Sequence, residues 1–242
     1  MTRLYLPQPL APQMELDLPA DAVRHLIQVL RMQAGEALTV FNGQGGEYQA
    51  VLEHVDRRQA RLRVGAHHAV SRESPLAVTL VQCVSKGERM DYTLQKAVEL
   101  GVSRIVPLLS ERSVVRLDAE RWARRQAHWE GVVIAACQQS GRTLIPPLAP
   151  VTDFSRWLAQ PPPPGLRLTL APEAPHSLRS LPRPDAGVSL LVGPEGGLSA
   201  AEIRQAGAAG WLPLRLGPRI LRTETAGVAL LASLQALWGD WH

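Results

Sequence analysis

Three short segments rich in glycine, proline and charged residues each follow an apolar run of strand length. They are residues 170–174 (LAPEA), 191–197 (LVGPEGG) and 216–226 (LGPRILRTETA). In open α/β sheets, ligands bind beyond the carboxyl ends of the strands. Gly193, Gly196 and Gly197 have no side chains that would block close approach of a ligand to the backbone. The segments therefore predict a ligand site, although ordinary strand-to-helix turns also favour Gly and Pro.

The charges of these segments indicate which ligand they suit. Residues 191–197 are not a phosphate loop of the GxxxxGK[ST] kind, because they contain no Lys and Glu195 would repel a triphosphate. They also lack the GxGxxG spacing of dinucleotide sites. A cofactor that carries positive charge is the better electrostatic match. S-adenosylmethionine, with its sulfonium, amine and adenine groups, fits that description.

Two different spacing patterns of apolar residues predict the strands and helices that position these segments. Residues 1–72 read as mainly β, with strands at 37–41, 48–52 and 60–64 and one helix capped by Asp21, which suggests a small barrel or sandwich. From residue 73 onward, strands and helices alternate, which predicts a parallel sheet covered by helices. The expected strands are 76–84, 105–109, 166–170, 188–192 and 212–216, and the expected helices include 119–140, 199–209 and 224–238. Ser199 and Glu202 form a capping-box pattern that predicts where one helix begins.

Composition excludes several classes of protein. Charged residues make up 20% and hydrophobic residues 45% of the 242 residues, so the chain is not disordered. The longest apolar runs are far shorter than a membrane span needs, and the N-terminus has no apolar core of signal-peptide length. Cys83 and Cys137 are too few for a disulfide framework, and His67–His68 lacks a supporting ligand cluster, so we expect no metal site. The interpretation is a soluble, cytoplasmic protein.

The basic residues are strongly biased toward arginine. Of the 26 cations, 24 are Arg and only Lys86 and Lys96 are Lys. Guanidinium groups pair well with phosphates, yet genome-wide drift toward Arg explains the bias equally well. A net charge of +4 is too mild to establish a nucleic-acid partner.

Paired C-terminal motifs carry a resemblance to a known family. The blocks VGPEGGLSAAE (192–202) and LGPRILRTETA (216–226), with KGERMD (86–91), QKAVELGV (95–102), QSGR (139–142) and HLIQVLR (25–31), closely resemble the bacterial 16S rRNA (uracil-N3) methyltransferases. Gln138 departs from the pattern, because the family often shows Glu there.

The resemblance implies a PUA-like RNA-binding β-barrel over residues 1–72, followed by a SPOUT α/β domain over residues 73–242 with a trefoil knot. It also implies a homodimer that uses S-adenosylmethionine to methylate N3 of a uridine in 16S rRNA, within the small ribosomal subunit. Two other functions stay open: a SPOUT enzyme that methylates another RNA position, and a non-catalytic RNA-binding factor on the same fold.

The segments that follow the strands and the family resemblance together predict the site residues. Arg222 would stabilise negative charge on the base, and Glu195 or Glu224 would accept the proton. Helix capping by Thr223, with Glu224 in the first turn, is the structural alternative. The cofactor residues are expected to be Leu170, Pro172, Leu191, Gly193, Pro194, Gly196, Leu216, Gly217, Ile220, Leu221, Arg222, Thr225 and Ala226. The expected RNA contacts are Arg3, His25, Arg31, Arg63, Lys86, Arg89 and Arg142.

Overall fold

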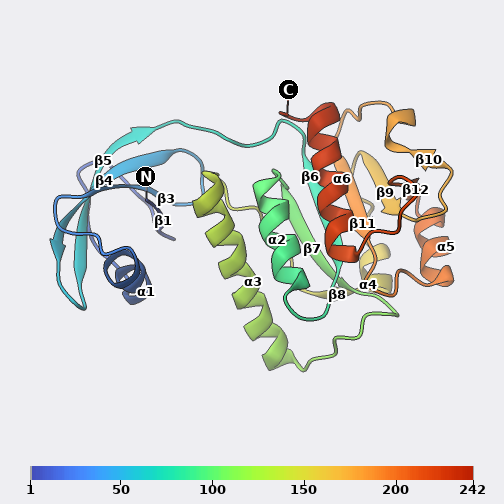
Figure 1. The fold of residues 1–242 in the computed structure, drawn as a ribbon, viewed down its shortest axis with the longest axis horizontal. Helices are drawn as coiled ribbons and strands as arrows, with labels where there is room; N and C mark the ends of the chain where they lie inside the picture. Colours follow the sequence, from blue (N-terminus) through green and yellow to red (C-terminus); the bar gives the residue numbers. More distant parts are fainter. Residues whose placement is uncertain (1, 242) are drawn as a thin grey trace. The chain divides into compact units, whose positions relative to one another are not determined.

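The computed structural model describes residues 2–241, which form two compact units (Figure 1). The first unit comprises the chain up to Glu73 together with Cys137–Ile145. The second comprises Ser74–Ala136 and the chain from Pro146 onward. Within the described residues, no helix is both long and apolar enough to cross a membrane.

The first unit contains a five-stranded sheet with the order β1-β3-β4-β5-β2. Leucine and valine side chains from its strands share one core with Leu26, which is fully buried. The predicted strand at 37–41 is confirmed, and the predicted strands at 48–52 and 60–64 extend further than expected. The strands are β1 (Arg3–Tyr5), β2 (Glu15–Asp17), β3 (Ala37–Phe41), β4 (Glu47–Val55) and β5 (Ala60–His68).

The helix of this unit begins differently from the prediction. Asp21 is not the N-cap, because α1 (Ala20–Val23) already begins after Pro19, whose extended backbone makes it the cap residue. Asp21 lies instead in the first turn, where a carboxylate still interacts favourably with the helix dipole. The chain continues as a π-helix over Arg24–Val29 with Leu30 as its C-cap, and Arg31 then adopts the unusual positive φ of 57°.

The second unit contains a seven-stranded parallel sheet with the order β10-β12-β9-β11-β6-β7-β8, as the alternating pattern predicts. Its strands are β6 (Val78–Cys83), β7 (Arg104–Leu109), β8 (Thr152–Asp153), β9 (Leu166–Leu170), β10 (His176–Ser177), β11 (Val188–Val192) and β12 (Leu212–Arg215). Its helices are α2 (Arg89–Glu99), α3 (Ala119–Ser140, whose last turn counts with the first unit), α4 (Phe154–Leu158), α5 (Ala200–Ala208) and α6 (Thr223–Trp238).

Helices cover both faces of this sheet. Helices α2 and α6 lie side by side on one face, and α6 packs directly against β6 and β11 (Figure 1). On the other face, Val81 and Leu191 from the strands pack in one cluster with Phe154 of α4 and Ala206 of α5. Because strand side chains alternate between faces, Leu80 and Val192 face α6 while their neighbours face α4 and α5.

Several local predictions in this unit are confirmed. The bounds of α3 match the expected helix 119–140. Ser199 caps α5 through a complete capping box, in which its hydroxyl accepts from the Glu202 N–H at 3.2 Å. Lys96 pairs with Glu99 on α2, as expected for a helix partner three residues on.

Candidate active site

A cavity of about 560 Å³ lies at the carboxyl ends of β9, β11 and β12. Three loops line it, and each follows one of these strands: residues 170–172, 192–198 and 216–222. The first residues of α6 and Arg89 at the start of α2 complete the wall. All three predicted segments therefore contribute to one site, as expected for strands that run parallel and end at the same edge.

Most of the expected cofactor residues line this cavity. They are Leu170, Pro172, Gly193, Pro194, Gly196, Leu216, Gly217, Ile220, Leu221, Arg222 and Ala226. Gly197, which the sequence also indicated, lines the cavity, and sequence reasoning missed Ala171, Val192, Leu198, Leu214, Arg219 and Thr223.

Leu191 and Thr225 were expected in the cavity wall and do not line it. Leu191 is fully buried in the core cluster beneath α4 and α5. Its neighbour Val192 occupies the cavity wall instead, because consecutive strand residues face opposite sides of the sheet. Thr225 lies in the first turn of α6 with an exposed side chain.

The loop after β11 is a tight turn whose two ends lie close together. The Gly197 N–H donates to the Pro194 carbonyl at 2.8 Å, and Gly197 has a φ of +68°, which favours glycine. A Cβ on Gly193 would lie only 2.9 Å from the Leu198 nitrogen and 3.1 Å from the Gly197 carbonyl carbon. Gly193 is therefore required by space, since no side chain fits between the two ends of the turn.

Thr223 does not cap α6, contrary to the structural alternative. The N-cap residue is Arg222, which makes no side-chain capping bond, and Thr223 is the first helical residue. The Thr223 hydroxyl donates to the Gly193 carbonyl at 2.6 Å and accepts from the Gln82 side-chain amide at 2.9 Å. This buried chain of hydrogen bonds ties the start of α6 to the loop after β11 and to β6.

Two carboxylates line the cavity in different surroundings. Glu195 Oε1 accepts from the Lys86 backbone N–H at 3.0 Å and from Arg89 Nη1 at 2.8 Å. Burial opposes ionisation of Glu195, but hydrogen bonds from its own N–H, Lys86 and Arg89 outweigh it, so the pKa lies below the usual 4.5. Glu224 Oε1 lies 3.7 Å from Arg89 Nε, and its Oε2 is buried with no hydrogen-bond partner among the described residues.

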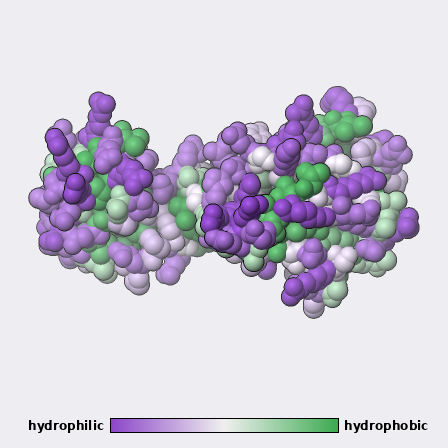
Figure 2. Space-filling view, turned by 90° about the horizontal axis from the view of Figure 1, so that it is seen from below, coloured by the Kyte–Doolittle hydropathy of each residue, from purple (hydrophilic) through white to green (hydrophobic). Residues whose placement is uncertain are grey.

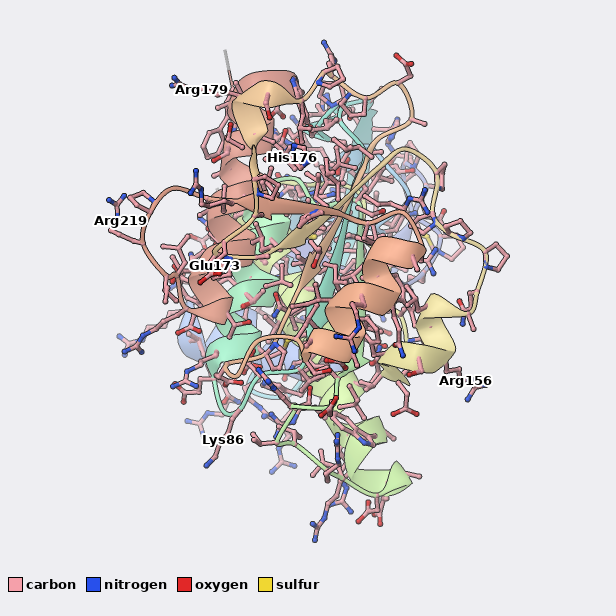
Figure 3. All side chains as sticks on the ribbon, turned by 90° about the vertical axis from the view of Figure 1, so that its right-hand side faces the viewer. Lys86, Arg156, Glu173, His176, Arg179 and Arg219 are labelled. Atoms are coloured by element: carbon pink, nitrogen blue, oxygen red, sulfur yellow. The ribbon has the colours of Figure 1, made fainter. Side chains whose placement is uncertain are left out.

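Cations lie on the rim of this cavity. Arg222 and Arg219 line it with exposed side chains, and Arg219 extends outward from the loop between β12 and α6 (Figure 3). Arg89 lines the cavity as well and pairs with Glu195, so this expected RNA contact also belongs to the pocket wall. The Lys86 side chain is exposed and extends away from the ribbon (Figure 3).

The remaining expected RNA contacts lie in the first unit. His25 is exposed on the π-helix, Arg31 is exposed two residues after the helix ends, and Arg63 pairs with Glu53. Arg3 forms an ion pair with Glu47, and its guanidinium lies over the Phe41 ring.

Arg142 is a correction to the expected RNA contacts. It is only 5% exposed, and its Nε donates to Glu73 at 2.9 Å. Its guanidinium is therefore committed inside the unit and does not reach a phosphate.

Comparisons with known proteins give consistent matches over the whole chain. The family model for the RNA methyltransferase domain matches residues 72–235, and that for the RNA methyltransferase PUA domain matches residues 18–65. The ribosomal RNA small subunit methyltransferase E of Buchnera aphidicola (from Schizaphis graminum) is 32% identical over 98% of this chain and 97% of its own length. The protein of the same name from Bacillus subtilis is 29% identical over 88% and 87%.

Solved structures agree with these matches. The ribosomal RNA small subunit methyltransferase E of Neisseria gonorrhoeae, bound to S-adenosyl methionine, is 42% identical, with a TM-score of 0.95 over all of both chains. A putative methyltransferase from Legionella pneumophila, in complex with the same cofactor, is also 42% identical, with a TM-score of 0.95 over 99% of this chain and 98% of its own. The resemblance carried by the motifs at 192–202 and 216–226 is therefore confirmed: the chain belongs to the ribosomal RNA small subunit methyltransferase E family.

Proposed function

We propose that the protein transfers a methyl group from S-adenosylmethionine to small-subunit ribosomal RNA, and that the acceptor is N3 of a uridine. The observation that carries the proposal is the cavity built from the three strand exits, in a chain of this family. The relatives named above act on small-subunit rRNA, and two similar structures hold S-adenosylmethionine.

The residues of the cavity fit this cofactor. The carboxylates of Glu195 and Glu224 suit a ligand that carries sulfonium and ammonium charges, and Glu224 Oε2 has no partner among the described residues. Backbone N–H and C=O groups of the loops suit the edge of a planar base, and Leu198, Leu216 and Ile220 supply apolar surface for its faces. When bound, S-adenosylmethionine supplies an electrophilic methyl group on sulfur.

Methylation at N3 requires loss of the imide proton, because the neutral nitrogen has little nucleophilicity. The negative charge then spreads over the neighbouring carbonyl oxygens, and Arg222, which lines the cavity, would stabilise it. Glu224 is the better candidate for the proton acceptor, since its Oε2 accepts no hydrogen bond from the described residues. Glu195 is the weaker candidate, because its lowered pKa makes it a poorer base.

For binding of the RNA, we propose exposed cations from both units. Lys86 and Arg219 border the cavity region of the second unit, and His25 and Arg31 lie on the first unit. Removal of one true phosphate contact should lower the salt slope of RNA binding by about one. Action on ribosomal RNA would place the protein in the cytoplasm.

We also propose that the protein is a homodimer. Apolar patches interrupt an otherwise hydrophilic surface (Figure 2). Tyr92 of α2, Leu237 of α6 and Ile220 of the cavity loop are exposed by 47%, 49% and 84%. Light scattering on the purified protein tests the dimer, and a mass equal to one chain would contradict it.

Two finer features of the fold are proposals as well. Buried side chains from all five strands of the first unit share one core, which suits a closed PUA-like barrel. After β12 the chain returns past β9 and β11 to reach β6 at Thr223, which suits a trefoil knot. Pulling the chain from both termini tests the knot, because a knotted chain extends to less than its full contour length.

The function is tested with purified protein, S-adenosylmethionine labelled in the methyl group, and rRNA from a strain that lacks this gene. We expect label in 3-methyluridine after nuclease digestion and mass spectrometry, and little label with Arg222→Ala. Label on a ribose or another base would redirect the proposal to a different SPOUT activity. Binding of RNA with no binding of S-adenosylmethionine in calorimetry would indicate a non-catalytic RNA-binding factor.

A further inference from the structure

The peptide bond between Gly196 and Gly197 lies in the cavity wall and is flanked by glycine on both sides. Such a peptide rotates easily, because neither neighbour has a Cβ to restrict its dihedral angles. Its orientation decides which backbone group faces the ligand. The wall therefore needs an external group to hold this peptide in one orientation.

Both polar groups of this peptide bond, its N–H and its C=O, form hydrogen bonds. Its N–H, on Gly197, donates to the Pro194 carbonyl at 2.8 Å within the turn. Its carbonyl, on Gly196, accepts from Arg112 Nη1 at 2.8 Å. Since the N–H and C=O of a trans peptide point in opposite directions, two bonds on opposite sides prevent it from flipping.

Arg112 comes from the loop after β7, which is itself fixed. Ser110 and Ser113 are buried and hydrogen-bond to each other through their hydroxyls at 3.0 Å. The Glu111 N–H donates to Glu202 Oε1 at 2.8 Å, and the other oxygen of Glu202 accepts from the Ser199 N–H at 2.8 Å. The backbone on each side of Arg112 is thus anchored, and one of these anchors is the cap of the helix that follows the cavity loop.

The Arg112 side chain has no acidic partner within residues 2–241, which sets it apart from Arg89 and Arg142. Its aliphatic part lies against Gly196, where an added Cβ would meet Arg112 Cβ and Cδ at an ordinary 3.5 Å. The side chain therefore covers the outer side of the turn, while the turn itself lines the cavity.

We propose that Arg112 is a positioning residue for cofactor binding: it holds the Gly196 carbonyl so that the turn at 194–197 keeps its binding conformation. The inference rests on the proposed use of S-adenosylmethionine. Arg112 does not itself line the cavity, so its effect on the ligand passes through the backbone. A lysine at this position would donate one hydrogen bond to the same carbonyl and should restore part of the effect.

The test compares Arg112→Ala and Arg112→Lys with Arg116→Ala in the full-length protein. Arg116 is an exposed arginine of the same loop, so its removal matches the loss of charge. We expect Arg112→Ala to bind S-adenosylmethionine about tenfold more weakly in calorimetry without RNA, and Arg112→Lys to be intermediate. Arg116→Ala should bind like the wild type, and thermal unfolding should be nearly unchanged in all three.

Kinetics supply a second measurement that a role in stability alone would not change. In Arg112→Ala the KM for S-adenosylmethionine should rise while the KM for rRNA stays the same. Unchanged cofactor affinity in Arg112→Ala, or an equal loss in Arg116→Ala, would overturn the inference. If the wild type itself fails to bind S-adenosylmethionine, the proposed function fails, which is a separate result.

Discussion

Replacement of Gly193 by alanine is the sharpest test of how the cavity loop is built. The new Cβ would lie 2.9 Å from the Leu198 nitrogen, 3.1 Å from the Gly197 carbonyl carbon and 3.2 Å from its Cα. All three atoms are backbone, so no side chain can rotate away to relieve the contact. Gly207→Ala on α5 is the matched control, because Gly207 does not line the cavity and its Cβ would meet no atom within 4 Å.

The size of the effect follows from these distances. Widening the 2.9 Å contact to an ordinary 3.4 Å moves the turn by about 0.5 Å. Overpacking of this kind costs about 1–3 kcal/mol, which corresponds to a loss in affinity of about 5- to 150-fold when the strain is relieved by a shift of the binding loop. The shift also lengthens the bond from Thr223 to the Gly193 carbonyl, now 2.6 Å.

Calorimetric titration with S-adenosylmethionine measures the effect, and circular dichroism confirms that the variants are folded. We expect Gly193→Ala to lose at least fivefold in affinity, and Gly207→Ala to stay within about twofold of the wild type. Equal affinities for the wild type and Gly193→Ala would refute the reasoning. A larger loss in Gly207→Ala than in Gly193→Ala would refute it as well.

Three further predictions concern the Thr223 hydroxyl, the Glu195 carboxylate and the two buried thiols. Thr223→Val should lower the free energy of unfolding in urea by about 1–3 kcal/mol, because the Gly193 carbonyl and the Gln82 amide lose their shared partner, whereas the exposed Thr225→Val should change it little. The stabilising effect of Glu195, measured as the difference in Tm from Glu195→Gln, should be constant above pH 4.5 and vanish as the pH falls through the lower folded-state pKa; a difference that grows in acid would contradict this. Burial raises the pKa of the thiols of Cys83 and Cys137 to about 12, so neither should react with iodoacetamide at pH 8 until the protein is unfolded, and labelling of the native protein would show that they are accessible.

Long elements with clear ends were predictable from the sequence. Helix α3 and strands β9 and β11 match their predicted bounds, because apolar runs or helical periodicity stop at glycine, proline or charged residues. Strands β1 and β2 were missed, since three residues are too few to show an alternating pattern. Their pairing depends on partners that are distant in sequence.

The site was predictable at the level of loops and less so at the level of side chains. All five residues of β11 are buried, so sequence alternation does not tell which of Leu191 and Val192 faces the cavity. Thr223 looked like a cap because Ser and Thr favour that position, yet its hydroxyl bonds to groups 30 and 141 residues away in sequence. The same strand-exit rule, applied to β7, would have pointed to Arg112.

Helix α3 prevents a simple division of the chain into its two units. Its residues up to Ala136 count with the second unit, and Cys137–Ser140 count with the first, so the same continuous helix belongs to both. A fragment cut after residue 73 would lack Arg142, leaving Glu73 without its buried cation, and would lack Gln138, which accepts from the Tyr5 N–H at 3.2 Å. No single cut separates the two units intact, so a fragment that ends at residue 73 would not contain the whole first unit.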